Sequence, residues 1–284
     1  MKNKCTYEMI TAKPTENLTG VTIEGEYDDF YNLVDAIHHM TGFEESYDDI
    51  YYGVKNRLLG ICYDLRHAYQ GDREICMIDN GMDEYKMKWH SMITPTQNVH
   101  FSVNVYFPEA VFVALSAPEL FIFSRGEYGS RRKDEEEHVY APKFAEYLQD
   151  KAQIELLCSV ILGALGEVIG DEELEKMLRH HSSLYRMEYN NYATMYVDKC
   201  NIEYFKTPVD KRKDKIRNIA KRLVKKPAAY DNMKYSLEAS ARNYGCSIYQ
   251  LEDPKLVYQS ESGNSKVRIS PLRSGRRRAN ALFL

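Results

Sequence analysis

Strand-like and helix-like segments are segregated along this chain, and that segregation limits its fold more than any other feature. Short runs rich in β-branched and aromatic residues lie before residue 108, where two helical stretches interrupt them, and long helical stretches follow residue 144. A doubly wound parallel sheet would instead require strands and helices to alternate throughout. The sequence therefore predicts an α+β fold, with an N-terminal antiparallel meander packed by helices and a mainly helical C-terminal part.

The expected strands are indicated by short apolar runs and by the turn residues between them. Asn80 and Gly81 separate two of these runs, and an Asn-Gly step between strand-like runs is typical of a tight hairpin. The run 99–107 alternates apolar and polar residues, which predicts one buried and one open face. The strands are expected at 5–11, 21–23, 74–78, 85–92 and 99–107, and the last three form the meander.

Two helices are expected to pack on this meander, and a loop is expected to separate it from the rest of the chain. Apolar residues recur with helical spacing over 27–41 and 48–70. Residues 124–138 combine a basic triplet, an acidic run and two glycines with almost no apolar side chains, which is typical of a loop or linker. The predicted organisation is an α+β domain at 1–123, a loop or linker at 124–138, and a mainly helical, basic part at 139–284.

The six cysteines and the apolar segments bear on where the protein resides. None of the cysteines forms a Cys-x-x-Cys pair, and the chain begins with a polar stretch that lacks an apolar signal region. Both features favour free thiols in a reducing, cytoplasmic setting. The most apolar windows, 105–123 and 156–169, contain prolines and glutamates or are shorter than the roughly 20 residues that span a bilayer. No membrane association is expected.

The helix expected at 48–70 ends in a concentration of polar side chains, which is the candidate catalytic site. Tyr63, Arg66, His67 and Gln70 share one face of the helix, next to its apolar face. Asp72 and Arg73 follow Gly71, a residue that tolerates the left-handed conformation at a helix end. Histidine is the side chain best suited to proton transfer near neutral pH, and arginine binds anionic groups bidentately. The predicted catalytic residues are Asp64, Arg66, His67 and Arg73, and the predicted substrate-binding residues are Tyr63, Gln70 and Asp72.

This segment allows two interpretations. In the first, the protein is an enzyme acting on a phosphorylated or nucleotide-like substrate that Arg66 and Arg73 hold. His67 would then act as general acid or base, and Asp64 would orient it. In the second, Asp64, Asp72 and the two arginines form a salt-bridged helix end, and His67 and Tyr63 are hydrogen-bonded into the meander.

The same segment carries a family resemblance. The stretch Tyr63-Asp64-Leu65-Arg66-His67-Ala68-Tyr69-Gln70-Gly71-Asp72-Arg73, together with Pro108-Glu109, resembles an uncharacterised bacterial family, a domain of unknown function. The resemblance covers about residues 18–125, a little over a third of the chain. It implies a bacterial or mobile-element origin, and it implies no activity or catalytic residue.

Charge is divided unevenly along the chain. Residues 1–205 contain 19 basic and 35 acidic residues, a net charge of −16, whereas residues 206–284 contain 19 basic and 7 acidic residues, a net charge of +12. Such asymmetry is typical of a surface that meets an anionic partner, here nucleic acid or an acidic protein. The alternative is that the basic part neutralises the acidic part within one fold. The predicted nucleic-acid-binding residues are Lys211, Arg212, Lys213, Lys215, Arg217, Lys221, Arg222, Arg276, Arg277 and Arg278.

Several common site motifs are absent from the sequence. It contains no phosphate-binding loop, no dinucleotide-binding glycine motif, no nucleophile elbow and no His-Glu-x-x-His zinc motif. His67, His90 and His100 fall on different expected elements and lack the spacing of metal ligands. The sequence therefore predicts no cofactor and no metal site.

Overall fold

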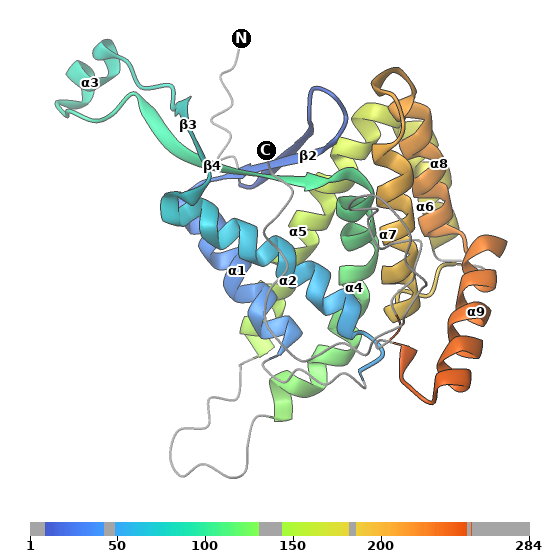
Figure 1. The fold of residues 1–284 in the computed structure, drawn as a ribbon. Coiled ribbons are helices and arrows are strands. Elements are labelled where there is room, and N and C mark those ends of the chain that lie inside the picture. The colour runs from blue at the N-terminus through green and yellow to red at the C-terminus, as the bar shows by residue number, and fades with distance from the viewer. Residues whose placement is uncertain (1–8, 43–48, 131–143, 182–185, 249–250, 252–284) are drawn as a thin grey trace. The chain divides into compact units, whose positions relative to one another are not determined.

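The protein contains two compact units, residues 1–226 and residues 227–284. The computed structural model describes residues 9–42, 49–130, 144–181, 186–248 and 251. The first unit contains a four-stranded sheet and most of the helices (Figure 1). The second unit contains one described helix, α9 (Ala228–Tyr244).

The sheet is antiparallel throughout and confirms the predicted α+β class. Its strands lie in the order β1-β2-β4-β3, so β4 pairs with both β2 and β3. In the register of β2 and β4, Val21 is opposite Val105 and Ile23 is opposite Val103, and all four side chains are buried. Because paired residues share a face of the sheet, these side chains define the face covered by helices. The strands are β1 (Thr11–Pro14), β2 (Gly20–Gly25), β3 (Glu74–Asp79) and β4 (Gln97–Tyr106).

Two expected strands differ from the structure. The run expected at 85–92 is helix α3 (Glu84–His90), so the Asn80-Gly81 step does not close a hairpin between two strands. The side chain of Asp83 accepts a hydrogen bond from the backbone N–H of Lys86 at 2.7 Å, and this N-cap starts the helix. The first strand begins at Thr11, later than the expected 5–11, and residues 5–8 lie outside the described residues.

The helices confirm most of the helical predictions. The helix expected at 27–41 is α1, and α5 and α6 follow the expected long helix and its successor. The helix expected at 48–70 is α2 with a π-helical turn, η1, attached to its end. The helical elements of the first unit, besides α3, are α1 (Tyr27–Thr41), α2 (Tyr52–His67), η1 (Ala68–Asp72), α4 (Phe107–Ser130), α5 (Phe144–Ile169), α6 (Asp171–His181), α7 (Asn191–Phe205), the 3₁₀ turn η2 (Val209–Lys211) and α8 (Arg212–Val224).

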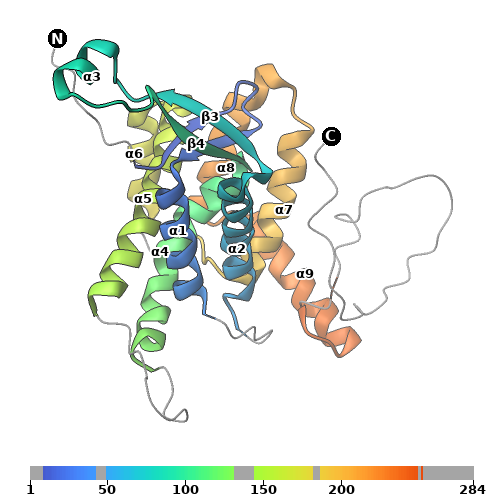
Figure 2. The same ribbon diagram turned by 90° about the vertical axis from the view of Figure 1, so that its left-hand side faces the viewer.

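Helix α4 lies at the centre of the first unit. Its residues Ala110 to Leu115 are all buried, so the helix is apolar on every side rather than amphipathic. It contacts α1, α2, α5, α7 and α8, and its N-terminus follows β4 directly. Figure 2 shows the helices on one side of the sheet, with α3 extending away from them.

The expected loop and domain boundary differ from the structure in part. Helix α4 continues through Ser130, so residues 124–130 of the expected loop are helical, and residues 131–138 lie outside the described residues. Helices α5 to α8 belong to the same compact unit as the sheet. The boundaries of the compact units 1–226 and 227–284 differ from those of the predicted division into 1–123, 124–138 and 139–284.

Helix α5 is long and apolar enough to span a membrane by length and composition, and it is the one such helix in the described part of the chain. Half of its most apolar stretch is buried within the unit, against α1, α4 and β1. A core helix of a soluble protein passes the same test. The burial of Ile154, Leu157 and Ile161 assigns this face of α5 to the core.

Candidate functional site

The predicted catalytic segment forms the joined ends of α2 and η1. Arg73 donates a hydrogen bond to Asp64 at 2.8 Å, and Nδ1 of His67 lies 2.8 Å from the carboxylate of Asp72. The ring of Tyr63 lies 4.2 Å from that of His67, between their centroids. The guanidinium of Arg66 lies over the Tyr63 ring, 5.6 Å from its centroid. The predicted substrate-binding residue Gln70 lies on η1 and is exposed.

This geometry agrees with the second interpretation in part: Arg73 pairs with Asp64, whereas Asp72 faces His67 instead of an arginine and Arg66 lies over the Tyr63 ring. The arginine and the histidine that would bind or protonate a substrate each already face a carboxylate. Gly71 has a φ of 89°, a left-handed value that lets the π-helical turn end and β3 begin. A π-helical turn is nevertheless a feature found often at functional sites, so the segment keeps a candidate role.

The basic residues of α8 divide into those with internal partners and those without. Lys215 and Arg222 both pair with Glu203 of α7, and Lys221 pairs with Glu173 of α6. Although burial alone would raise it, hydrogen bonds from Lys215 and Arg222 lower the pKa of Glu203. These three cations of α8 are therefore neutralised by glutamates of neighbouring helices.

Two further predicted residues of this group are also held internally. Arg212 donates to the backbone oxygen of Asn17 at 2.7 Å, and Arg217 pairs with Asp214 at 2.9 Å. Lys211 and Lys213 are exposed, and in the described part of the chain they have no ion pair. Arg276, Arg277 and Arg278 lie outside the described residues.

A depression of about 410 Å³ opens where α7 meets η2 and α8. Lys206, Lys211 and Lys215 line it with Asn218 and the acidic Glu203 and Asp214. Lys206 is exposed and was missed by the sequence prediction, which began its basic set at Lys211. The available signal was charge alone, because residues 203–226 contain ten basic and three acidic residues.

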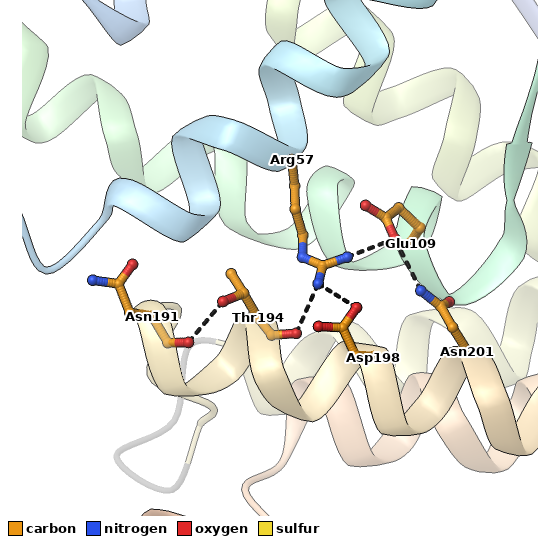
Figure 3. Close-up of polar contacts among 6 residues, drawn as sticks. All are labelled: Arg57, Glu109, Asn191, Thr194, Asp198 and Asn201. Atoms are coloured by element: carbon orange, nitrogen blue, oxygen red, sulfur yellow. Dashed lines mark hydrogen bonds and ion pairs between the residues drawn. The ribbon is translucent and has the colours of Figure 1, made fainter. Parts of the chain in front are cut away.

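A second polar cluster, which was not predicted from the sequence, lies between α2, α4 and α7 (Figure 3). Arg57 of α2 donates to Glu109 of α4 and to Asp198 of α7, each at 2.6 Å. It also donates to the backbone oxygen of Thr194 at 2.9 Å. Asn201 donates to the same carboxylate oxygen of Glu109 at 2.9 Å. We call these four side chains, Arg57, Glu109, Asp198 and Asn201, the Arg57 cluster.

Burial sets the electrostatics of the Arg57 cluster. The Arg57 side chain is 15% exposed, and burial alone would lower its pKa, but Glu109 and Asp198 raise it. Partial burial raises the pKa of Asp198, an effect that outweighs the opposing attraction of Arg57. Nε of Arg57 and Oδ1 of Asn201 are buried without a hydrogen-bond partner. Because its charged groups are directed at one another, the cluster connects three helices rather than presenting groups to a ligand.

Asn191 makes a related connection at the start of α7. Its side chain accepts from the N–H of Gly53 at 2.5 Å and donates to the backbone oxygen of Asp49 at 2.7 Å. Its own N–H donates to the backbone oxygen of Ile50 at 3.0 Å. The segment that enters α2 is thereby fixed to α7 beside the Arg57 cluster.

The histidine, cysteine and acidic side chains of the described residues decide whether the protein could bind a metal ion or carry a reactive thiol. No three histidine, cysteine, aspartate or glutamate side chains of the described ranges lie together in a way that could hold a metal ion. His67, His90 and His100 do not meet in such a group. The five cysteines in the described ranges are free thiols. Burial raises the pKa of Cys62, Cys158 and Cys200 to about 12, which leaves these thiols protonated and unreactive near neutral pH.

The fold and these sites define an α+β protein whose antiparallel sheet is covered by a helical layer that carries a lysine-lined depression. The chain belongs to a family described as a domain of unknown function (DUF6904), whose family model matches residues 10–261. The match includes the segment Tyr63 to Arg73 and extends well beyond the 18–125 of the sequence resemblance. No curated protein and no solved structure matches the chain.

Proposed function

We propose that this protein is a binding protein that engages the phosphate backbone of a nucleic acid through three lysines, Lys206, Lys211 and Lys213. We call these residues the η2 lysine surface. The observation that carries the proposal is that all three are exposed around η2 and have no ion pair in the described part of the chain. The neighbouring basic residues of α8 have acidic or backbone partners instead.

Lysines without acidic partners suit this role for an electrostatic reason. A phosphate backbone is surrounded by condensed counterions, and a cationic side chain that replaces them gains the entropy of their release. A lysine already paired with a glutamate must first break that pair, so it contributes less. The depression beside η2 allows Lys206 and Lys211 to approach one ligand from two elements. Charge steering of this kind requires no sequence motif, which agrees with the absence of one.

The test measures affinity by fluorescence anisotropy of labelled single-stranded and duplex DNA and RNA in buffer of low ionic strength. The variant Lys206→Gln/Lys211→Gln/Lys213→Gln is expected to bind at least about tenfold more weakly than the wild-type protein, because it loses three phosphate contacts. The matched control is Lys13→Gln/Lys151→Gln/Lys176→Gln. It removes the same formal charge from lysines that are already paired with glutamates.

The outcomes of this experiment separate the alternatives. Affinity of the control within about twofold of wild type supports the η2 lysine surface, whereas equal losses in both variants identify a non-specific effect of net charge. Absence of nucleic-acid binding at low salt contradicts the proposal. A labelled polyglutamate peptide that binds more tightly than the nucleic acids would assign the surface to an acidic protein partner.

A second candidate function is acid–base catalysis on a phosphorylated substrate, favoured by the hydrogen bond between His67 and Asp72. A carboxylate on one imidazole nitrogen orients the ring and leaves the other nitrogen for proton transfer. In this function, His67→Ala and Arg73→Ala each abolish turnover of phosphomonoester and nucleotide substrates. Their melting temperatures stay within a few degrees of wild type, about the effect of losing an exposed ion pair. Unchanged turnover with equal loss of stability in both variants would identify a purely structural helix end.

A further inference from the structure

An extension of the sheet leaves apolar side chains uncovered. We call residues 74–99 the β3–β4 arm, which consists of β3, α3 and the first residues of β4, and which extends away from the helices (Figures 1 and 2). Helix α3 has no buried residue, Trp89 is 74% exposed and Ile93 is 99% exposed. A soluble monomer rarely exposes so many neighbouring apolar side chains, and such a surface usually marks an interface.

The strands of the arm expose the face that is buried elsewhere in the sheet. Met77 is opposite Val99, and Ile75 is opposite Phe101, so all four side chains share one face. Phe101 is buried on the helix-covered face, whereas Ile75 is 53%, Met77 55% and Val99 46% exposed. The apolar face of the sheet therefore continues into the arm beyond the helices that cover it.

Strand β3 also ends the sheet, because among the described strands it pairs with β4 alone. Proteins protect an exposed edge with lysine, proline or a bulge, since an unprotected edge pairs with another strand. The sequence of β3, Glu-Ile-Cys-Met-Ile-Asp, contains neither lysine nor proline, and its register with β4 runs without interruption from Glu74 to Asp79. The edge is thus open for strand addition.

We propose that the occupant of this edge is a second copy of the chain, whose β3 pairs antiparallel with β3 about a two-fold axis at Cys76. In this register Ile75 is opposite the partner's Met77, and Arg73 is opposite the partner's Asp79. Arg73 has extended backbone geometry, so the strand can continue through it. One guanidinium nitrogen of Arg73 donates a hydrogen bond to Asp64, and its other N–H groups remain available for the partner's Asp79. Each end of the pair gains an ion pair, and the middle gains an apolar contact.

The charges select both this register and the second copy. A slip of one residue in one direction places Glu74 opposite the partner's Asp79, and a slip in the other direction places Asp72 opposite the partner's Asp79. Like charges directly opposite each other destabilise a strand pair. Strand β3 is preceded by a basic residue, Arg73, and ends on an acidic residue, Asp79. When a second β3 runs antiparallel to it, each basic end meets an acidic end, as a two-fold interface requires.

The same pairing provides a contact surface for α3. In an antiparallel pair, the α3 that follows one β3 lies at the end where η1 precedes the other β3. Tyr69 of η1 lies at that end, and its ring forms a cluster with those of Tyr27 and Tyr31 of α1, with centroids 5.2–6.1 Å apart. Tyr27 and Val99 line one depression beside it. The exposed rings of Tyr85 and Trp89 on α3 and the tyrosine cluster can therefore cover each other twice in one dimer, beyond the small area of two strands.

The first test measures mass by light scattering and sedimentation over a wide range of protein concentration. The wild-type chain is expected at twice its 33.1 kDa, and Met77→Lys is expected at 33.1 kDa because a charge is placed in the apolar centre of the strand pair. The control is Leu148→Lys, which places the same charge on an exposed position of α5 and should leave the dimer intact. Circular dichroism checks that both variants keep the fold.

The second test uses the wild-type chain and determines the register. A short bismaleimide is expected to join two chains through Cys76, and Cys76→Ser is expected to lose this product while Cys246→Ser retains it. A wild-type chain that is monomeric at every concentration overturns the proposal, as does a dimer that Met77→Lys leaves unchanged. A dimer that crosslinks through another cysteine and not through Cys76 also overturns it.

Discussion

Replacing Arg57 with methionine is expected to lower the free energy of unfolding by about 2–3 kcal/mol. This is less than the roughly 3–5 kcal/mol for breaking a fully buried ion pair, because the side chain of Asp198 is 46% exposed. The substitution keeps most of the side-chain volume but leaves the carboxylates of Glu109 and Asp198 without their shared cation. It also removes the hydrogen bond to the backbone oxygen of Thr194. Because these groups belong to α2, α4 and α7, the loss should appear in global unfolding, measured by urea denaturation monitored by circular dichroism.

Two comparisons assign this loss to the Arg57 cluster. Arg217→Met breaks the exposed pair with Asp214 and is expected to cost under about 1 kcal/mol. The neutral variant Arg57→Met/Glu109→Gln/Asp198→Asn is expected to recover much of the stability lost by Arg57→Met, because no uncompensated charge then remains buried. A loss for Arg57→Met as small as that for Arg217→Met would contradict a structural role for the cluster.

The same variant should respond to pH in a defined direction. The pKa of Asp198 is already raised by burial, and removal of Arg57 raises it further. A carboxyl group with a raised folded pKa stabilises the fold below its unfolded pKa, and this contribution is lost as pH rises through the folded pKa. The stability difference between wild type and Arg57→Met should therefore be smaller in mildly acidic buffer than at neutral pH.

Gly20→Ala is expected to destabilise the protein by about 3 kcal/mol, near the upper end of the usual range for overpacking. A Cβ atom at Gly20 would lie 2.1 Å from the backbone oxygen of Val105 on the neighbouring strand β4. Backbone atoms of a paired strand cannot rotate away as a flexible side chain does. The N–H of Gly20 also donates to the side chain of Thr15 at 3.0 Å, so the glycine is held from both sides.

The control for this prediction is Gly60→Ala in the exposed interior of α2. No atom lies within 4 Å of a Cβ built there, and alanine favours a helix over glycine by about 1 kcal/mol. Thermal unfolding should therefore show a lower melting temperature for Gly20→Ala and an equal or higher one for Gly60→Ala. A wild-type melting temperature for Gly20→Ala would show that β2 and β4 are not as close as described.

Much of the fold could be predicted from local patterns, because those patterns act within a few residues. The apolar spacing of α1 and α5 and the alternation in β4 each depend on neighbours in sequence, and all three elements were predicted. Helix α3 was mistaken for a strand because seven residues carry too little periodicity. Its N-cap at Asp83 was the signal that distinguishes the two.

The functional sites were less predictable because they depend on distant residues. The sequence placed Asp64, His67, Asp72 and Arg73 together, since they lie within three helical turns of one another. Nothing in the sequence brings Arg57 to Asp198, which lies 141 residues away. For the basic helix, charge indicated the surface, but only packing against Glu203 distinguishes paired cations from exposed ones such as Lys213.

The most direct test of the η2 lysine surface is the salt dependence of nucleic-acid binding. The logarithm of the association constant for duplex DNA should fall linearly with the logarithm of salt concentration, by about 0.9 for each phosphate contacted. The variant Lys206→Gln/Lys211→Gln/Lys213→Gln is expected to have a slope shallower by about 2–3 than that of the wild-type protein, because it loses one phosphate contact for each lysine. The same slope in both proteins, or wild-type binding that does not change with salt, would contradict the proposal.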